Sequence, residues 1–214
     1  MAEAKLQPIT IRKGHGFIAM LKDGEHFRAE ILAKQVGKYT EVCRWFLTDP
    51  DGEMIQEGTI EVGQTASLDI AVPKAGVYNL VCDPGANSAH VTLLNDHAAM
   101  LGQTVSFIGE PCPLYVYCPP GLKSFKVTLD TPAPGETAKL TVLDPSGQEF
   151  TSLATGEKGV VVAEVKVPEG MSGKAWGLKI GPAPTGVTED MTVKLDDLLP
   201  AYWSQAPDRL VTPK

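Results

Sequence analysis

The chain has no long apolar run. No stretch of its 214 residues approaches the roughly 18 consecutive apolar residues of a membrane-spanning helix, so no membrane span is expected. Residues 1–5 also lack the apolar centre of a signal peptide. Two locations stay open: a cytoplasmic protein, or the mature part of a secreted protein given a start methionine. We favour the extracellular or periplasmic location.

Basic residues are scarce as well. Lys and Arg number 19 against 26 Asp and Glu, which leaves a formal net charge of −7. Nucleic-acid binding requires a basic face that neutralises phosphates, so no nucleic-acid partner is expected. No long block of like charges indicates an acidic tail or a polybasic membrane patch.

Motifs of catalysis and metal binding are missing too. The sequence contains no GxSxG, Walker-type or HExxH motif, and no CxxC pair of the kind that holds zinc. Its histidines are scattered and lie in no nucleophile or metal motif: His15, His26, His90 and His97. We therefore expect no catalytic residue, no metal and no cofactor, and a protein that is not an enzyme.

Short alternating segments, separated by turn residues, make up most of the chain. Apolar and polar residues alternate in them with period 2, and many of the 21 Gly and 17 Pro residues lie between them. One buried face and one solvent-exposed face are typical of antiparallel sheets. Only residues 95–101 and 196–199 have the pattern of a helical turn. The predicted fold class is all-β, and the clearest strands are residues 27–31, 67–72, 125–129, 139–142, 163–167 and 191–195.

An internal repeat organises these segments. An Asp-Pro-x-Gly turn at residues 49–52 matches one at 144–147, and each lies the same distance before a strand-ending proline, Pro73 or Pro168. The sequence thus predicts two tandem antiparallel β-sandwich domains, immunoglobulin-like or jelly-roll. We place them at residues 1–97 and 98–197, followed by an extended C-terminal strap at 198–214.

The first turn carries three carboxylates, on Asp49, Asp51 and Glu53, which is a pattern that calcium can use. The second turn keeps only Asp144 and Glu149. Because the repeat retains the turn residues and loses a carboxylate, we interpret both segments as plain hairpin turns.

Residues 114–121, together with 125–127 and 143–147, resemble the jelly-roll or immunoglobulin-like accessory modules appended to bacterial secreted hydrolases. The pre-peptidase C-terminal and carbohydrate-binding modules are the nearest such families. The resemblance covers about half of each repeat and rests on positions that determine the fold. It implies a module that binds polysaccharide, packs on a catalytic domain or mediates assembly.

The cysteines form two pairs. Cys43 and Cys82 each share a strand face with apolar residues, and the matching positions of the second repeat are Ala138 and Ile180. We expect them to face each other across the core of the first domain, either as an immunoglobulin-style disulfide or as two buried thiols. Cys112 and Cys118 are too far apart along an extended strand to bond unless the chain bends at Pro113.

Aromatic side chains are the best candidates for a binding site, because sugar rings stack on exposed Tyr and Trp faces. Tyr115 and Tyr117 alternate with the apolar residues of their strand, and Tyr202 and Trp203 have no counterpart in the repeat. These four are our candidate ligand-binding residues. The alternative for Tyr202 and Trp203 is that they anchor the strap on the second domain.

The predicted function is a non-catalytic extracellular accessory or binding module, with a polysaccharide or a partner protein as its partner. The alternative is a structural subunit that associates with itself in a filament or sheath, through exposed sheet edges. An enzyme with a dispersed site is the third class.

Overall fold

The computed structural model describes residues 6–156 and 159–212. Strands account for nearly all regular structure in these ranges, and the one helical element among them is the short 3₁₀ helix η1 (Pro207–Arg209). No helix in the described ranges is long and apolar enough to cross a membrane. The chain divides after Met100 into two compact units, here called unit 1 and unit 2.

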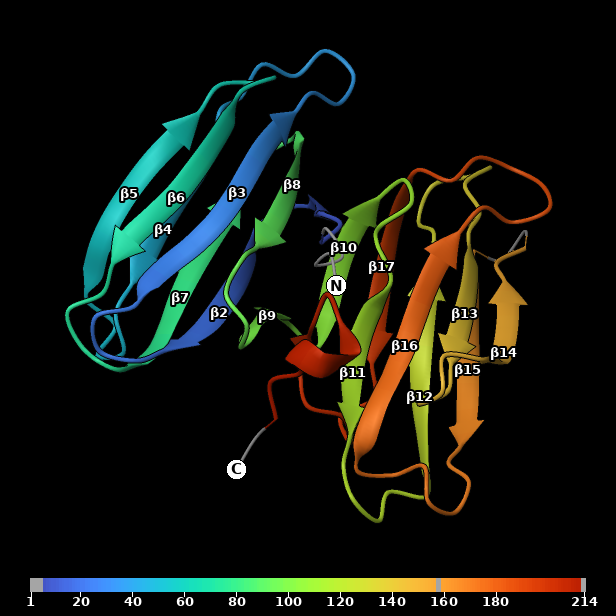
Figure 1. Ribbon diagram of the computed structural model, residues 1–214. Coiled ribbons are helices and arrows are strands. Elements are labelled where there is room, and N and C mark those ends of the chain that lie inside the picture. Colours follow the sequence, from blue (N-terminus) through green and yellow to red (C-terminus); the bar gives the residue numbers. More distant parts are fainter. Residues whose placement is uncertain (1–5, 157–158, 213–214) are drawn as a thin grey trace. The chain divides into compact units, whose positions relative to one another are not determined.

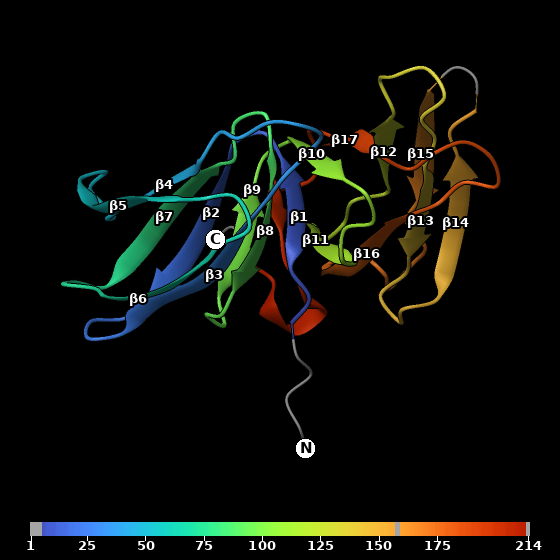
Figure 2. The same cartoon turned by 90° about the horizontal axis from the view of Figure 1, so that it is seen from above.

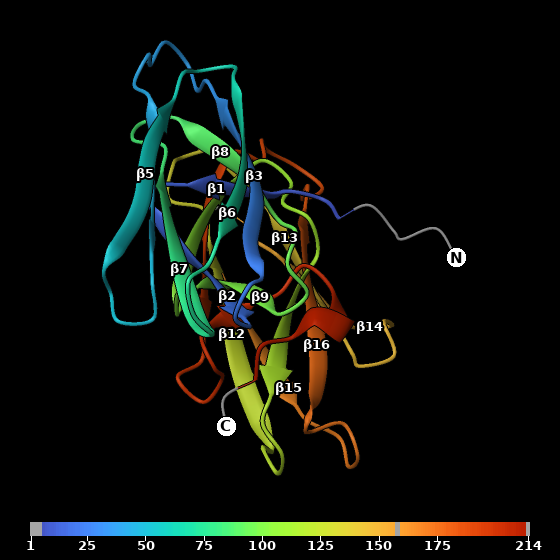
Figure 3. The same cartoon turned by 60° about the vertical axis from the view of Figure 1, so that its left-hand side comes forward.

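Unit 1 is built from two antiparallel sheets. One has the strand order β1-β8-β3-β6 and the other the order β9-β2-β7-β4-β5. Figure 3 shows β5 and β3 on different sides of this unit, and Figure 2 shows β4 and β3 in different layers from above. The strands are β1 (Ile9–Arg12), β2 (His15–Leu21), β3 (His26–Lys34), β4 (Cys43–Thr48), β5 (Met54–Ile60), β6 (Thr65–Ala71), β7 (Gly76–Asp83), β8 (Ser88–Leu93) and β9 (Ala98–Leu101).

Unit 2 also has two sheets, ordered β10-β17-β12-β15 and β11-β16-β13-β14. In Figure 1, β11 and β16 lie in front of β10, β17 and β12. A short ninth segment, β18, lies beside β11. The strands are β10 (Thr104–Ile108), β11 (Leu114–Cys118), β12 (Ser124–Asp130), β13 (Lys139–Leu143), β14 (Glu149–Ala154), β15 (Val160–Lys166), β16 (Lys174–Gly181), β17 (Asp190–Leu195) and β18 (Tyr202–Trp203).

The predicted fold class, antiparallel β-sandwich, is confirmed. Counted within each unit, both have the order first-eighth-third-sixth in one sheet and second-seventh-fourth-fifth in the other. This is the order of a jelly roll, in which the chain crosses between sheets after almost every strand. An immunoglobulin sandwich instead keeps its first, second, fourth and fifth strands in one sheet.

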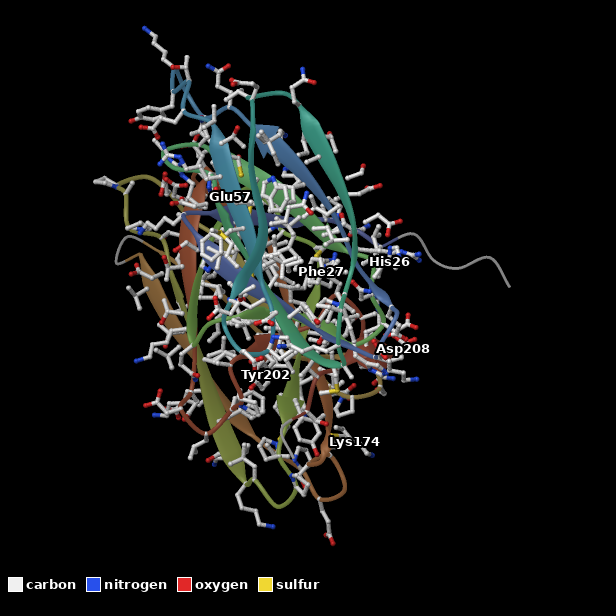
Figure 4. The ribbon with its side chains drawn as sticks, turned by 90° about the vertical axis from the view of Figure 1, so that its left-hand side faces the viewer. His26, Phe27, Glu57, Lys174, Tyr202 and Asp208 are labelled. Carbon is white, nitrogen blue, oxygen red and sulfur yellow. The ribbon has the colours of Figure 1, made fainter. Side chains whose placement is uncertain are left out.

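The alternating residues form the cores as expected. Phe27 of β3 is fully buried, whereas its neighbour His26 projects outward, as Figure 4 shows. In unit 2 the centre of the core is Trp176, whose ring meets Phe125 and Phe150 edge to face, with centroids 5.4 and 5.2 Å away. Burial of one strand face on each sheet is what holds the two layers together.

The two Asp-Pro-x-Gly segments are hairpin turns with the same hydrogen bonds. Asp49 Oδ1 accepts backbone N–H groups of Asp51 and Glu53 at 2.8 and 3.0 Å. Asp144 Oδ1 accepts the N–H groups two and four residues ahead at 2.8 and 3.1 Å. In the first turn the Lys74 ammonium lies 2.6 Å from Asp49 Oδ2 and also contacts Asp51. The Lys74 ammonium thus pairs with two of the three carboxylates of this turn.

One local expectation is wrong. Residues 98–101, expected as part of a helical turn, form strand β9 beside β2. The Met20 N–H donates to the carbonyl of His97 at 2.9 Å just before this strand. Pairing with β2 therefore decides the conformation of a segment whose local propensity is ambiguous. Residues 196–199 do form a turn, closed by the Leu199 N–H on the carbonyl of Asp196 at 2.9 Å.

Replacing Gly76 by alanine is expected to lower the free energy of unfolding of unit 1 by about 2–3 kcal/mol. A Cβ at this residue, whose φ is +151°, would lie 2.3 Å from Cγ of Pro50 in the hairpin turn. Gly52→Ala is the matched control, because its φ is +85° but nothing lies within 4 Å of an added Cβ. Its strain alone costs about 1 kcal/mol. Chemical denaturation measures both, and equal losses would show that the approach of Pro50 is unimportant.

Candidate functional site

Strand β11 presents two tyrosines on the side away from the core. Leu114, Val116 and Cys118 are almost completely buried, while Tyr115 and Tyr117 between them are partly exposed. The neighbouring strand β16 pairs with β11 in the antiparallel sheet. The alternation expected from the sequence is thus present, and both tyrosines share one outer face.

Small residues of β16 lie beside these rings. Tyr115 is paired with Gly177, and Tyr117 with Ala175. A Cβ added to Gly177 would lie 3.2 Å from Cε1 of Tyr115 and 3.0 Å from Cβ of Leu143 on β13. The Tyr115 ring therefore rests close over the sheet backbone, where any larger residue at 177 would displace it.

The chain after residue 200 adds a third tyrosine. Tyr115 and Ser204 form an antiparallel bridge, in which each N–H donates to the other carbonyl, at 2.8 and 2.9 Å. Paired residues share a face and successive residues alternate. By this alternation Tyr202, two residues before Ser204, lies on the same side of the strand as Ser204 and Tyr115. We call Tyr115, Tyr117 and Tyr202 the tyrosine face.

An open depression adjoins this face. Tyr202 lines it together with Pro119, which follows β11, and the turn at residues 197–201. Its volume is about 370 Å³, and Leu101 and Gly102 complete its wall. Asp197 is its one charged lining residue, and the rest is apolar or backbone. The depression can hold a single ring, and Asp197 offers it a hydrogen-bond acceptor.

The sequence offers Trp203 as a sugar-stacking residue, but in the structure it is buried. It is 1% exposed, its Nε1–H donates to the carbonyl of Gly102 at 2.7 Å, and its ring meets Phe107 edge to face at 6.3 Å. No ring face is free for a ligand. Of the two roles that the sequence leaves open, Trp203 has the anchoring one, because alternation along β18 turns it to the opposite side from Tyr202.

Cys43 and Cys82 lie close together, but not across the sandwich. They belong to the neighbouring strands β4 and β7 of one sheet, and their sulfur atoms are 3.5 Å apart. Both are buried free thiols. The expected inter-sheet arrangement is wrong, since the jelly-roll order makes the fourth and seventh strands neighbours within one sheet.

The other two cysteines, Cys112 and Cys118, are not bonded to each other. Cys112 and Cys118 are both buried free thiols, and burial raises their pKa to about 12 and about 11. At neutral pH both are therefore protonated and weakly nucleophilic. Within the described ranges, no group of three or more His, Cys, Asp and Glu side chains is placed to hold a metal ion.

The histidines do not gather at a site. His26 Nδ1 lies 2.5 Å from Asp69 Oδ1 on the exposed side of β3 and β6, where Arg28 contacts the same carboxylate at 3.5 Å. His90 on β8 is half-buried, and burial, together with the nearby Lys34, lowers its pKa. These contacts are those of surface ion pairing and of packing, respectively.

Comparisons with known proteins add little to this description. The sequence matches no known protein family, and no curated protein is similar to it. Among solved structures, the chain is similar to the apo form of a Bacteroides uniformis β-glucuronidase 3 at 12% identity and a TM-score of 0.27. The match covers 85% of this chain but 27% of that one, so the chain spans about a quarter of its length. At this TM-score the likeness carries no argument about function.

Proposed function

We propose that the chain is a non-catalytic binding module and that its tyrosine face binds a polysaccharide. The supporting observation is that Tyr115, Tyr117 and Tyr202 are all partly exposed and come from two segments joined by the Tyr115–Ser204 bridge. The C–H groups of a pyranose ring pack on the face of an aromatic ring, and the phenol hydroxyls add hydrogen bonds at the edge. The proposal includes an extracellular or periplasmic location for the module.

The charge around the site favours a neutral polysaccharide. Asp197 is the charged residue of the adjoining depression, and the whole chain carries a net charge of −7. An acidic sugar would be repelled by both, whereas the hydroxyls of a neutral sugar can donate to the Asp197 carboxylate. The depression beside Tyr202 would receive one ring of the chain while Tyr117 and Tyr115 support the next.

Replacing Tyr117 by alanine is expected to weaken binding at least tenfold, which corresponds to about 1.4 kcal/mol. The purified chain is titrated calorimetrically with neutral polysaccharides such as β-glucan, xylan and mannan, with polygalacturonate as the acidic comparison. Tyr39→Ala is the control, because Tyr39 is 52% exposed and lies in unit 1. Absence of binding to every neutral polymer, or equal affinity of the Tyr117→Ala variant, would reject the proposal.

A structural subunit is the second candidate, and one feature of unit 1 favours it. The sheet containing β2, β7, β4 and β5 exposes four large apolar side chains: Met20 at 50%, Val77 at 40%, Phe46 at 38% and Met54 at 58%. Met20 and Val77 are directly paired, so part of this surface is continuous. Contiguous exposed apolar area often marks association between proteins. Analytical ultracentrifugation distinguishes the two candidates, because a self-assembling subunit sediments as large, concentration-dependent species.

A further inference from the structure

Cys43 and Cys82 are a pair of adjacent buried thiols outside the tyrosine face. Their sulfur atoms are 3.5 Å apart, and the side chains are 1% and 0% exposed. Contact with the Cys82 thiol lowers the pKa of Cys43, whereas the same contact and burial raise the pKa of Cys82. Cys43 is therefore the thiol of the pair that ionises more readily, while Cys82 keeps its proton.

The strand register determines how far apart their backbones are. Cys82 is paired with Trp45, so Cys43 lies diagonally from it, two residues along β4. Diagonal partners have Cα atoms about 7–8 Å apart, and a disulfide usually spans up to about 6.8 Å. Closing the bond needs a shift of about 1 Å. Cys43 can move toward Cys82, because the pairing of β4 with β7 starts at Arg44 and Cys43 is paired only with Ile60 of β5, on its other side.

We propose that Cys43 and Cys82 become a cross-strand disulfide when the chain folds in the presence of a small-molecule disulfide such as oxidised glutathione. The Cys43 thiolate attacks one sulfur of the small disulfide, which forms a mixed disulfide and releases one small thiol. Cys82, as thiolate, then attacks the Cys43 sulfur, which forms the protein disulfide and releases the second small thiol. The protein loses two protons and two electrons, and the small disulfide takes them up and is reduced to two thiols.

Burial of both sulfur atoms determines when during folding the disulfide can form. Exchange requires that an attacking sulfur reach its target in line, and the folded unit encloses both sulfur atoms. The bond therefore forms while β4 and β7 are pairing and is protected once the sheets have closed. Oxidation of the folded, reduced protein is expected to be at least tenfold slower than oxidation during refolding.

The test starts from unfolded, fully reduced full-length chain, refolded in a mixture of oxidised and reduced glutathione. Peptide mapping without reductant is expected to find Cys43 linked to Cys82, and the melting temperature of unit 1 to rise by roughly 10 °C over the reduced protein. The Cys112→Ser variant is the matched control and is expected to form the same bond. The Cys82→Ser variant is expected to form none at Cys43 beyond a glutathione adduct.

A chain in which Cys43 and Cys82 both remain free after oxidative refolding, or bond to Cys112 or Cys118, would overturn the proposal. Equal oxidation rates for folded and refolding protein would overturn the folding-coupled part of it. If Cys82→Ser does not fold, Cys43→Ala replaces it, because the matching position of unit 2 is the fully buried Ala138. Loss of the bond in that variant with retained strand signal by circular dichroism supports the proposal.

Discussion

Replacing Trp176 by alanine is expected to lower the free energy of unfolding of unit 2 by about 3–5 kcal/mol. Trp176 is fully buried between Phe125 and Phe150, and its Nε1–H donates to the carbonyl of Met171 at 3.1 Å. The substitution removes one of the two buried tryptophans of unit 2 and leaves a cavity that two rigid neighbouring rings cannot fill. It also leaves a carbonyl without its donor.

Chemical denaturation followed by circular dichroism measures the loss. Trp176→Phe separates the two contributions, because it retains an aromatic ring but not the hydrogen bond, and is expected to cost less than the alanine variant. Tyr39→Ala, at a residue that is 52% exposed, is expected to change the stability by less than about 0.5 kcal/mol. A Trp176→Ala variant as stable as the Tyr39→Ala variant would show that the ring is not part of a packed core.

The second large effect is expected at Trp203, where alanine should cost unit 2 about 3–5 kcal/mol and lower its melting temperature by roughly 10 °C or more. The ring fills a site next to Phe107, and its N–H is bonded to Gly102, about a hundred residues earlier in the chain. Without this anchor the segment after residue 200 loses its hold on β11. Tyr202 then loses its place on the tyrosine face.

Trp203→Ala should therefore weaken polysaccharide binding as well as stability, although Trp203 itself contacts no ligand. Tyr202→Ala is the control with the opposite expectation: weaker binding with little change in melting temperature, because Tyr202 is partly exposed. Calorimetric titration and thermal unfolding of both variants check this. Unchanged stability of Trp203→Ala would mean that the C-terminal segment is not anchored by this residue.

Several features of the fold follow from the sequence because they depend on local chemistry. Alternation in segments such as residues 125–129 predicts strands with one buried face, and Phe125, Val127 and Leu129 are the buried ones. The Asp-Pro-x-Gly pattern predicts a hairpin turn, since the Asp side chain and Gly backbone make that turn by themselves. The outward position of Tyr115 and Tyr117 follows from the same alternation.

Other features depend on which strands become neighbours, and no local pattern contains that information. Cys43 and Cys82 lie side by side because the fourth and seventh strands share a sheet, an order that the sequence leaves open between jelly-roll and immunoglobulin-like sandwiches. Residues 98–101 form a strand because β2 offers an edge to pair with.

In the candidate site, too, some features follow from the sequence and others only from the tertiary structure. The residue types and the outward face of β11 are determined by the sequence alone, from period-2 alternation. The separation of Tyr202 from Trp203, one on the outer face and the other in the core, is decided by the bridge between Tyr115 and Ser204. A backbone pairing between residues about ninety positions apart sets the side to which each neighbouring aromatic points, because one step along a strand reverses the face.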